Sequence, residues 1–209
     1  MTREEGVGRR EGYRRKFEKK NIYMDARELG LLLANHPRTR GYFNGVFASD
    51  QLPDEEEPGF YVVNTEPSWE RGSHWTAIEL GVTPHYFDSY GLPPLVEDVA
   101  SYLPPGYVAN TKTLQHPLAT TCGQWCIFFV WKRCQGWGME ELTAPFNCRN
   151  LLVNDHAMTH MVETEFKTDL EVQDRDFLQS QVNRTMGQYL IRNQDKAAVA
   201  DLIMNIGKN

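Results

Sequence analysis

A polar turn runs directly into a strongly apolar segment at residues 119–131. The apolar positions, among them Ile127, Phe128 and Trp131, favour a helix buried in a core. Cys122 then occupies the first turn, where free N–H groups and the macrodipole favour negative charge and lower a thiol pKa from about 8.5 towards neutrality. A lone cysteine is more often a small buried apolar residue, so the case for a nucleophile depends on the rest of the chain.

Upstream of this segment, the pattern first predicts one helix. Asp25 can cap its N-terminus together with Glu28, and Pro37 should end it. Residues 41–53 are rich in glycine and aromatic residues, which favours extended chain with turns. An acidic loop at residues 54–58 follows, and we interpret it as a solvated loop.

Three short apolar runs then predict strands. Residues 60–63 are typical of a buried strand, and residues 75–80 and 85–87 are two further strands joined by a hairpin connection. If the last two pair antiparallel, His74 and Asp88 lie near the same end of the sheet, because one precedes the hairpin and the other follows it.

The chain between this hairpin and the cysteine helix predicts one more helix and one more strand. Residues 96–103 have an amphipathic helical pattern, and residues 107–114 read as a strand that Gln115 closes. A loop over residues 116–121 then leads to Cys122.

Beyond the cysteine helix the pattern is helical. We expect short helices around residues 151–152 and 156–160, and periodic apolar positions continue over residues 174–205. His156 and His160 could hold a metal from one helical face, but no acidic third ligand stands at a motif spacing, which favours packed or surface histidines.

Length and composition indicate a globular protein. The 209 residues, 41% of them hydrophobic, suit one large domain or two small ones. We expect a basic tail at residues 1–22, a compact domain at 23–168 and a helical extension at 169–209. There is no run of 18 apolar residues and no signal-peptide pattern, so we expect no membrane span and no secretion.

Four cysteines in this spacing predict neither a disulfide framework nor a zinc site. Cys122 and Cys126 are four apart in one predicted helix, and the tight Cys-x2-Cys pairs of a structural zinc site are missing. The pattern therefore favours a reducing compartment. We expect a chemistry that needs no metal or other cofactor.

Charge is distributed unevenly along the chain. Residues 1–20 hold eight basic and four acidic side chains, while the remainder holds 14 basic and 24 acidic ones. A basic terminus of this kind is usually a solvated tail; the sharper alternatives are an arm that binds DNA or another polyanion, and a nuclear address.

Four residues with complementary chemistry stand at the ends of predicted elements, in the order His74, Asp88, Gln115 and Cys122. A cysteine protease needs this set: a thiolate attacks the scissile carbonyl, an imidazole moves the proton, a carboxylate orients the imidazole, and an amide donor steadies the oxyanion. The residue types assign these roles to Cys122, His74, Asp88 and Gln115, with the Cys122 backbone N–H as a second oxyanion donor. Two neighbours of this set, Trp75 and Gly123, are candidates for shaping a narrow substrate cleft beside the sulfur.

The same residues carry a resemblance. The motif resembles the adenovirus maturation proteases, the adenain family, and their relatives in virus-like DNA transposons and adintovirus-type genomes; it comprises His74-Trp75, Phe87-Asp88-Ser89-Tyr90-Gly91, Gln115 and Cys122-Gly123. Residues 37–53 look especially like the transposon branch, and the resemblance covers about residues 25 to 165.

The resemblance implies a papain-related α+β fold, with a central mixed sheet and flanking helices, and cleavage of capsid precursor proteins at glycine-containing sites during virion maturation. It also implies a monomer located in the virion and the host cell, including the nucleus, and activation by DNA or by a short viral peptide. Adenain has a glutamate where this chain has Asp88, and an aspartate followed by serine is more like the ubiquitin-like-protein proteases. Two alternatives therefore stay open: a deconjugating or processing protease for a ubiquitin-like modifier, and a non-catalytic virion or binding protein.

Overall fold

The computed structural model describes residues 24–166 as an α+β fold built on one five-stranded mixed sheet. The predicted basic tail, the predicted C-terminal extension and the periodic positions at 174–205 lie outside the described residues. The elements follow one another as α1 (Ala26–Asn35), β1 (Phe43–Ala48), the 3₁₀ helix η1 (Ser49–Gln51), β2 (Gly59–Asn64), β3 (Trp75–Leu80), β4 (His85–Phe87), α2 (Glu97–Tyr102), β5 (Val108–Ala109), α3 (Cys122–Arg133), α4 (Met139–Thr143) and α5 (Leu151–Phe166).

The five strands lie side by side in the order in which they occur in the chain. The central pairs, β2 with β3 and β3 with β4, are antiparallel, whereas β1 runs parallel to β2 and β5 runs parallel to β4. The predicted hairpin is confirmed, with Ala77 opposite Phe87 and Glu79 opposite His85. This register brings the start of β3 and the end of β4 to the same edge of the sheet.

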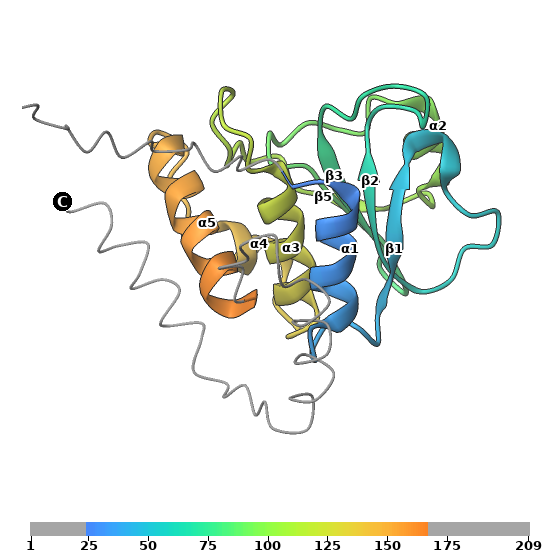
Figure 1. Cartoon of the computed structure of the whole chain (residues 1–209), viewed down its shortest axis with the longest axis horizontal. Helices are drawn as coiled ribbons and strands as arrows, with labels where there is room; N and C mark the ends of the chain where they lie inside the picture. The colour runs from blue at the N-terminus through green and yellow to red at the C-terminus, as the bar shows by residue number, and fades with distance from the viewer. Residues whose placement is uncertain (1–23, 167–209) are drawn as a thin grey trace, which may run out of the picture.

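Both faces of the sheet are covered, which is why β2 is buried along its whole length. One face packs with α1, α3 and α5 into the larger core cluster, and the other packs against α2 through Val99 and Leu103. Figure 1 shows the same division, with α1, α3, α4 and α5 on one side of the strands and α2 on the other.

The cysteine helix α3 is the most enclosed element of the fold. All residues from Cys122 to Lys132 are buried, polar Gln124 included. The ammonium group of Lys132 lies 3.5 Å from the ring centroid of Trp131 and 4.9 Å from that of Trp137. These cation–π contacts stabilise the buried charge. The predicted buried helix is therefore confirmed, and its rigid surroundings fix the position of its first residue.

The first predicted helix is also confirmed. In α1 the side chain of Asp25 accepts a hydrogen bond from the backbone N–H of Glu28, and the side chain of Glu28 accepts one from Asp25. This reciprocal capping satisfies N–H groups that a helix start leaves without partners. Leu29 and Leu33 of α1 are fully buried against the core.

Two predictions need correction. The strand expected over residues 107–114 is only the pair Val108–Ala109, because Asn110 turns its side chain to the backbone of Asp88 and the chain leaves the sheet. The short helices expected around residues 151–152 and 156–160 are one continuous helix, α5, since no glycine or proline interrupts it.

Candidate active site

His74 and Asp88 meet at the edge of the sheet where β3 begins and β4 ends. The Nε2 atom of His74 lies 3.1 Å from Oδ1 of Asp88, as the antiparallel pairing of these strands predicts. Both side chains are largely withdrawn from solvent, with 14% and 5% of their surface exposed. Water therefore competes weakly with this hydrogen bond.

A tight turn fixes the Asp88 carboxylate. The backbone N–H of Gly91 donates to the carbonyl of Asp88 at 2.8 Å, and the N–H of Tyr90 donates to the Asp88 side chain at 2.7 Å. Gly91 has a φ of +71°, and a Cβ atom there would lie 2.8 Å from the backbone of Lys112, so both conformation and space favour glycine. Asn110 holds the other side by bonding the N–H and the carbonyl of Asp88.

The imidazole of His74 is held as a cation. Burial alone would lower its pKa, but hydrogen bonds to Asp88 and to Cys122, together with the charges of both groups, raise the pKa of His74 to about 9. Because Asp88 takes Nε2, the Nδ1 atom is left for the sulfur. His74 is therefore an imidazolium at neutral pH, and it is hydrogen-bonded to both Asp88 and Cys122.

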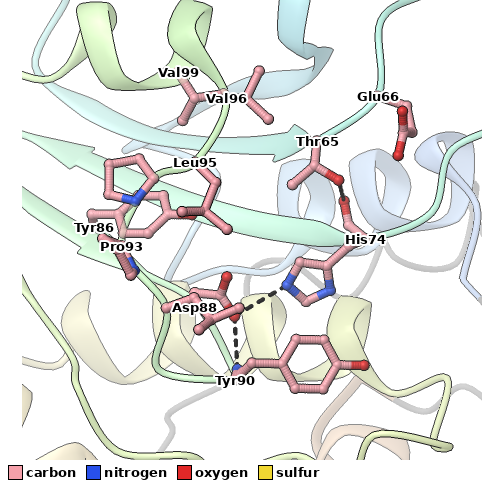
Figure 2. A pocket seen from close by; sticks show the side chains of 12 residues that line it. Thr65, Glu66, His74, Tyr86, Asp88, Tyr90, Pro93, Leu95, Val96 and Val99 are labelled. Carbon is pink, nitrogen blue, oxygen red and sulfur yellow. Dashed lines mark hydrogen bonds and ion pairs between the residues drawn. The ribbon is translucent and has the colours of Figure 1, made fainter.

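Tyr90 covers the exposed side of this pair. Its ring stacks on the His74 imidazole, with centroids 4.7 Å apart and an interplanar angle of 25°. Figure 2 shows the ring of Tyr90 beside that of His74, with Asp88 bonded to both residues. An aromatic face over an imidazolium is electrostatically favourable and restricts rotation of the ring.

Gln115 lies next to the same turn and is fully buried. Its Oε1 atom accepts a hydrogen bond from the Ser89 hydroxyl at 2.6 Å. Its Nε2 atom donates to the carbonyl of Ala119 at 2.8 Å and to the hydroxyl of Tyr90 at 3.3 Å. The structure therefore connects Gln115 to His74 and Asp88 through the intervening residues Ser89 and Tyr90.

Two polar residues of α5, Asn154 and Asp155, hold the loop that precedes Cys122. Neither was predicted from the sequence. Asp155 accepts hydrogen bonds from the hydroxyl of Thr121, the indole N–H of Trp125 and the backbone N–H of His116. Asn154 donates to the carbonyl of Leu114 at 3.0 Å. Their burial, 0% and 5% exposed, distinguishes them from the polar residues of a solvated helical face, and the local sequence does not show it.

Trp75 and Gly123, expected to shape the substrate cleft, pack into the core. Trp75 is 5% exposed and its indole N–H donates to the carbonyl of Met24 at 3.0 Å. A Cβ atom on Gly123 would lie 3.0 Å from the Cβ of Met24 and 3.3 Å from Cδ2 of Leu29. The absent side chain of Gly123 thus makes room for the start of α1, which differs from the role expected for it.

A cavity of about 420 Å³ opens beside His74 and Asp88. Its wall is largely apolar and comes from the chain after Tyr90, including Leu92, Leu95 and Val96. Leu95 is 76% exposed at its rim, and Glu66 adds a carboxylate on the opposite side. His74, Asp88 and Tyr90 contribute to its lining, whereas Cys122 and Gln115 do not.

The other candidate ligands are dispersed. Cys126, Cys134 and Cys148 are free like Cys122, and burial raises the pKa of Cys126 well above its usual range and that of Cys134 to about 12. His156 and His160 are both exposed on α5. Within residues 24–166, no group of three or more histidine, cysteine or acidic residues is placed to hold a metal ion.

In the comparison with known proteins, no protein-family model and no curated protein matches the chain.

Among the helices of residues 24–166, none has the length and apolar character needed to cross a membrane.

Proposed function

We propose that this protein is a cysteine endopeptidase whose nucleophile is Cys122. The observation that carries the proposal is the chain of contacts from Asp88 to His74 and on to Cys122, which raises the pKa of His74 to about 9. An imidazolium next to a sulfur at the N-terminus of α3 stabilises the thiolate.

The residues act in sequence during peptide hydrolysis. The Cys122 sulfur attacks the scissile carbonyl carbon, and the carbonyl electron pair moves to oxygen. When the C–N bond breaks, His74 gives its proton to the leaving amine while Asp88 holds the ring. His74 then takes a proton from water, whose oxygen attacks the thioester carbon; the C–S bond breaks, the acid product leaves, and the thiolate and imidazolium are restored. Gln115 and the Cys122 backbone N–H are the expected oxyanion donors.

We further propose a papain-related arrangement and a role in maturing viral or transposon capsid precursors at glycine-containing sites. The mixed sheet with α3 packed against it is compatible with that arrangement. The order His74, Asp88, Gln115, Cys122 and its adenain-like motifs support the substrate class. DNA binding and activation by DNA would involve residues 1–20, where the basic side chains gather and which lie outside the described part.

A deconjugating protease for a ubiquitin-like modifier is the second candidate. Exposed apolar side chains stand in the loops that lead to or from the catalytic residues: Trp69 is 76% exposed, Leu118 is 88% exposed and Leu95 is 76% exposed. Apolar side chains exposed around a cleft suit contact with a folded protein. This candidate keeps the same chemistry and changes only what supplies the binding energy.

The test is hydrolysis of a short peptide of the type Leu-x-Gly-Gly by the full chain. We expect turnover by the wild type, none by Cys122→Ala, and full turnover by the matched variant Cys148→Ala, whose thiol is exposed. In Cys148→Ala, which lacks the exposed thiol, iodoacetamide should alkylate Cys122 fastest, because burial keeps Cys126 and Cys134 protonated. Faster labelling of another cysteine with activity retained would contradict the assignment, and a folded but inactive wild type would favour the non-catalytic alternative.

A further inference from the structure

The amide of Gln115 has both of its hydrogens engaged in the free protein. One points to the carbonyl of Ala119 over a short 2.8 Å bond, and the other points to the hydroxyl of Tyr90 over a longer 3.3 Å bond. An oxyanion donor needs one hydrogen that can turn to the substrate oxygen. The longer bond, to the Tyr90 hydroxyl, is the weaker of the two, so its hydrogen is the one that can turn to a substrate. We therefore expect the substrate oxygen to bind on the side of the Tyr90 hydroxyl.

Ala119 and Ser89 together hold the Gln115 amide in this orientation. The Ser89 hydroxyl donates to Oε1 of Gln115 at 2.6 Å, and Ser89 is 1% exposed. A flipped amide would turn Oε1 towards the carbonyl of Ala119, which can only accept, and Ser89 would have to accept from Nε2 instead of donating. The Ala119 carbonyl therefore keeps Nε2, and with it the donor hydrogens, on the side of Tyr90, while the Ser89 hydroxyl holds Oε1 on the other side.

Tyr90 is built into the site at three points. Its backbone N–H bonds the Asp88 carboxylate, its ring stacks on His74, and its hydroxyl meets Gln115. Burial, and then the nearby charge of Cys122, raise the pKa of the Tyr90 phenol, so the hydroxyl keeps its proton at neutral pH. The phenol is thus a neutral O–H group that contacts the Gln115 amide and lies near enough to Cys122 to respond to its charge.

We propose that Tyr90 is a further catalytic residue, whose hydroxyl donates a hydrogen bond to the oxyanion together with Gln115. The inference rests on the proposed peptidase activity. As the sulfur–carbon bond forms, the carbonyl electron pair moves to oxygen, and this oxygen takes the Nε2 hydrogen that Tyr90 accepts in the free protein. Tyr90 then directs its O–H to the same oxygen and keeps its proton throughout. Ser89 is a positioning residue that acts through Gln115.

The test compares Tyr90→Phe with the wild type and with Tyr42→Phe, a matched loss of a phenol hydroxyl at a residue that is 60% exposed. Phenylalanine keeps the stacked ring and the backbone N–H, so only the donor is lost. We expect kcat to fall by about 10², the usual effect of removing one oxyanion donor, with little change in KM. Tyr42→Phe should match the wild type.

Alkylation provides the readout that separates this role from a structural one. Iodoacetamide reacts with a thiolate without forming an oxyanion, so Tyr90→Phe should alkylate at Cys122 at the wild-type rate and with the wild-type pH profile. If Tyr90→Phe hydrolyses peptide as fast as the active wild type, the inference is overturned while the proposed function stands. A parallel loss of alkylation and hydrolysis also overturns it, because the hydroxyl would then act on the thiolate. A wild type without peptide turnover removes the proposed function itself.

A double-mutant cycle tests Ser89. Ser89→Ala should lower kcat in the wild type but have little further effect in Gln115→Ala, because Ser89 acts only through that amide. Equal effects of Ser89→Ala in both backgrounds would overturn the positioning role.

Discussion

The hydroxyl of Thr121, the residue before Cys122, donates a 2.6 Å hydrogen bond to the Asp155 carboxylate of α5. This contact joins two segments separated by 34 residues. Asp155 is 5% exposed, and its two oxygens accept hydrogen bonds from Thr121, Trp125 and His116. The position of Cys122 is thereby tied to a helix that contributes no atom to the proposed chemistry.

We predict that Asp155→Asn destabilises the fold and lowers kcat. An amide cannot accept from Thr121, Trp125 and His116 together, because one of its two ends donates. Loss of a buried hydrogen bond to a charged group costs about 1.5–3 kcal/mol, and urea unfolding would measure the change. Asp54→Asn, in the exposed acidic loop, is the matched control. An unchanged unfolding midpoint for Asp155→Asn would show that the carboxylate is dispensable.

Activity should decline as the pH rises through about 9. His74 has its pKa raised to about 9, so the imidazolium that protonates the leaving amine is lost above that pH. The same shift adds stability that is complete below the unfolded pKa of about 6.5 and is lost as the pH approaches and passes 9. Asp88→Asn should move the alkaline limit of kcat/KM to lower pH and leave more activity than His74→Ala. An alkaline limit unchanged in Asp88→Asn would assign it to another group.

Gly123→Ala should destabilise the protein because its new Cβ would lie 3.0 Å from the Cβ of Met24. Overpacking of a core typically costs about 1–3 kcal/mol. Gly81→Ala is the control, since no heavy atom lies within 4 Å of the added group there. Thermal unfolding of both variants would measure the difference. Equal stability of the two would mean that the start of α1 yields to the extra atom.

The two enzymatic candidates differ in where the binding energy comes from. A capsid-maturation protease must recognise a short extended segment, whereas a deconjugase takes much of its affinity from the folded modifier. We expect useful turnover of the Leu-x-Gly-Gly peptide and no large gain in kcat/KM when a folded SUMO or ubiquitin precedes it. A gain of several orders of magnitude, abolished by Leu95→Ser but not by Val82→Ser at the far hairpin, would select the deconjugase.

The sequence predicted correctly those elements that are formed by residues close together in the chain. The hairpin of β3 and β4 was predictable because its strands are neighbours in the chain, and that hairpin alone places His74 beside Asp88. The enclosed helix starting at Cys122 was predictable because its apolar run is uninterrupted.

The rest depends on partners distant in the chain. Ser89 and Gln115 are 26 positions apart, and the amide of Gln115 offers no sequence signal for which group will orient it. Asp155 looks like a polar residue of a solvated helical face until α5 is packed against the loop before Cys122. The strand expected over residues 107–114 ends after Ala109 because the side chain of Asn110 bonds to the backbone of Asp88. This contact spans 22 positions of the chain, so the local sequence does not predict it.

Because α3 is enclosed by the core, it tolerates amino-acid substitutions less well than the exposed loops do. Every residue from Cys122 to Lys132 is buried, so almost any substitution there disturbs packing. The loops bearing Trp69, Leu95 and Leu118 are exposed and carry no core side chain at those positions. Substitutions in these loops can therefore change what the proposed peptidase binds without moving Cys122, so recognition and the proposed chemistry can evolve separately.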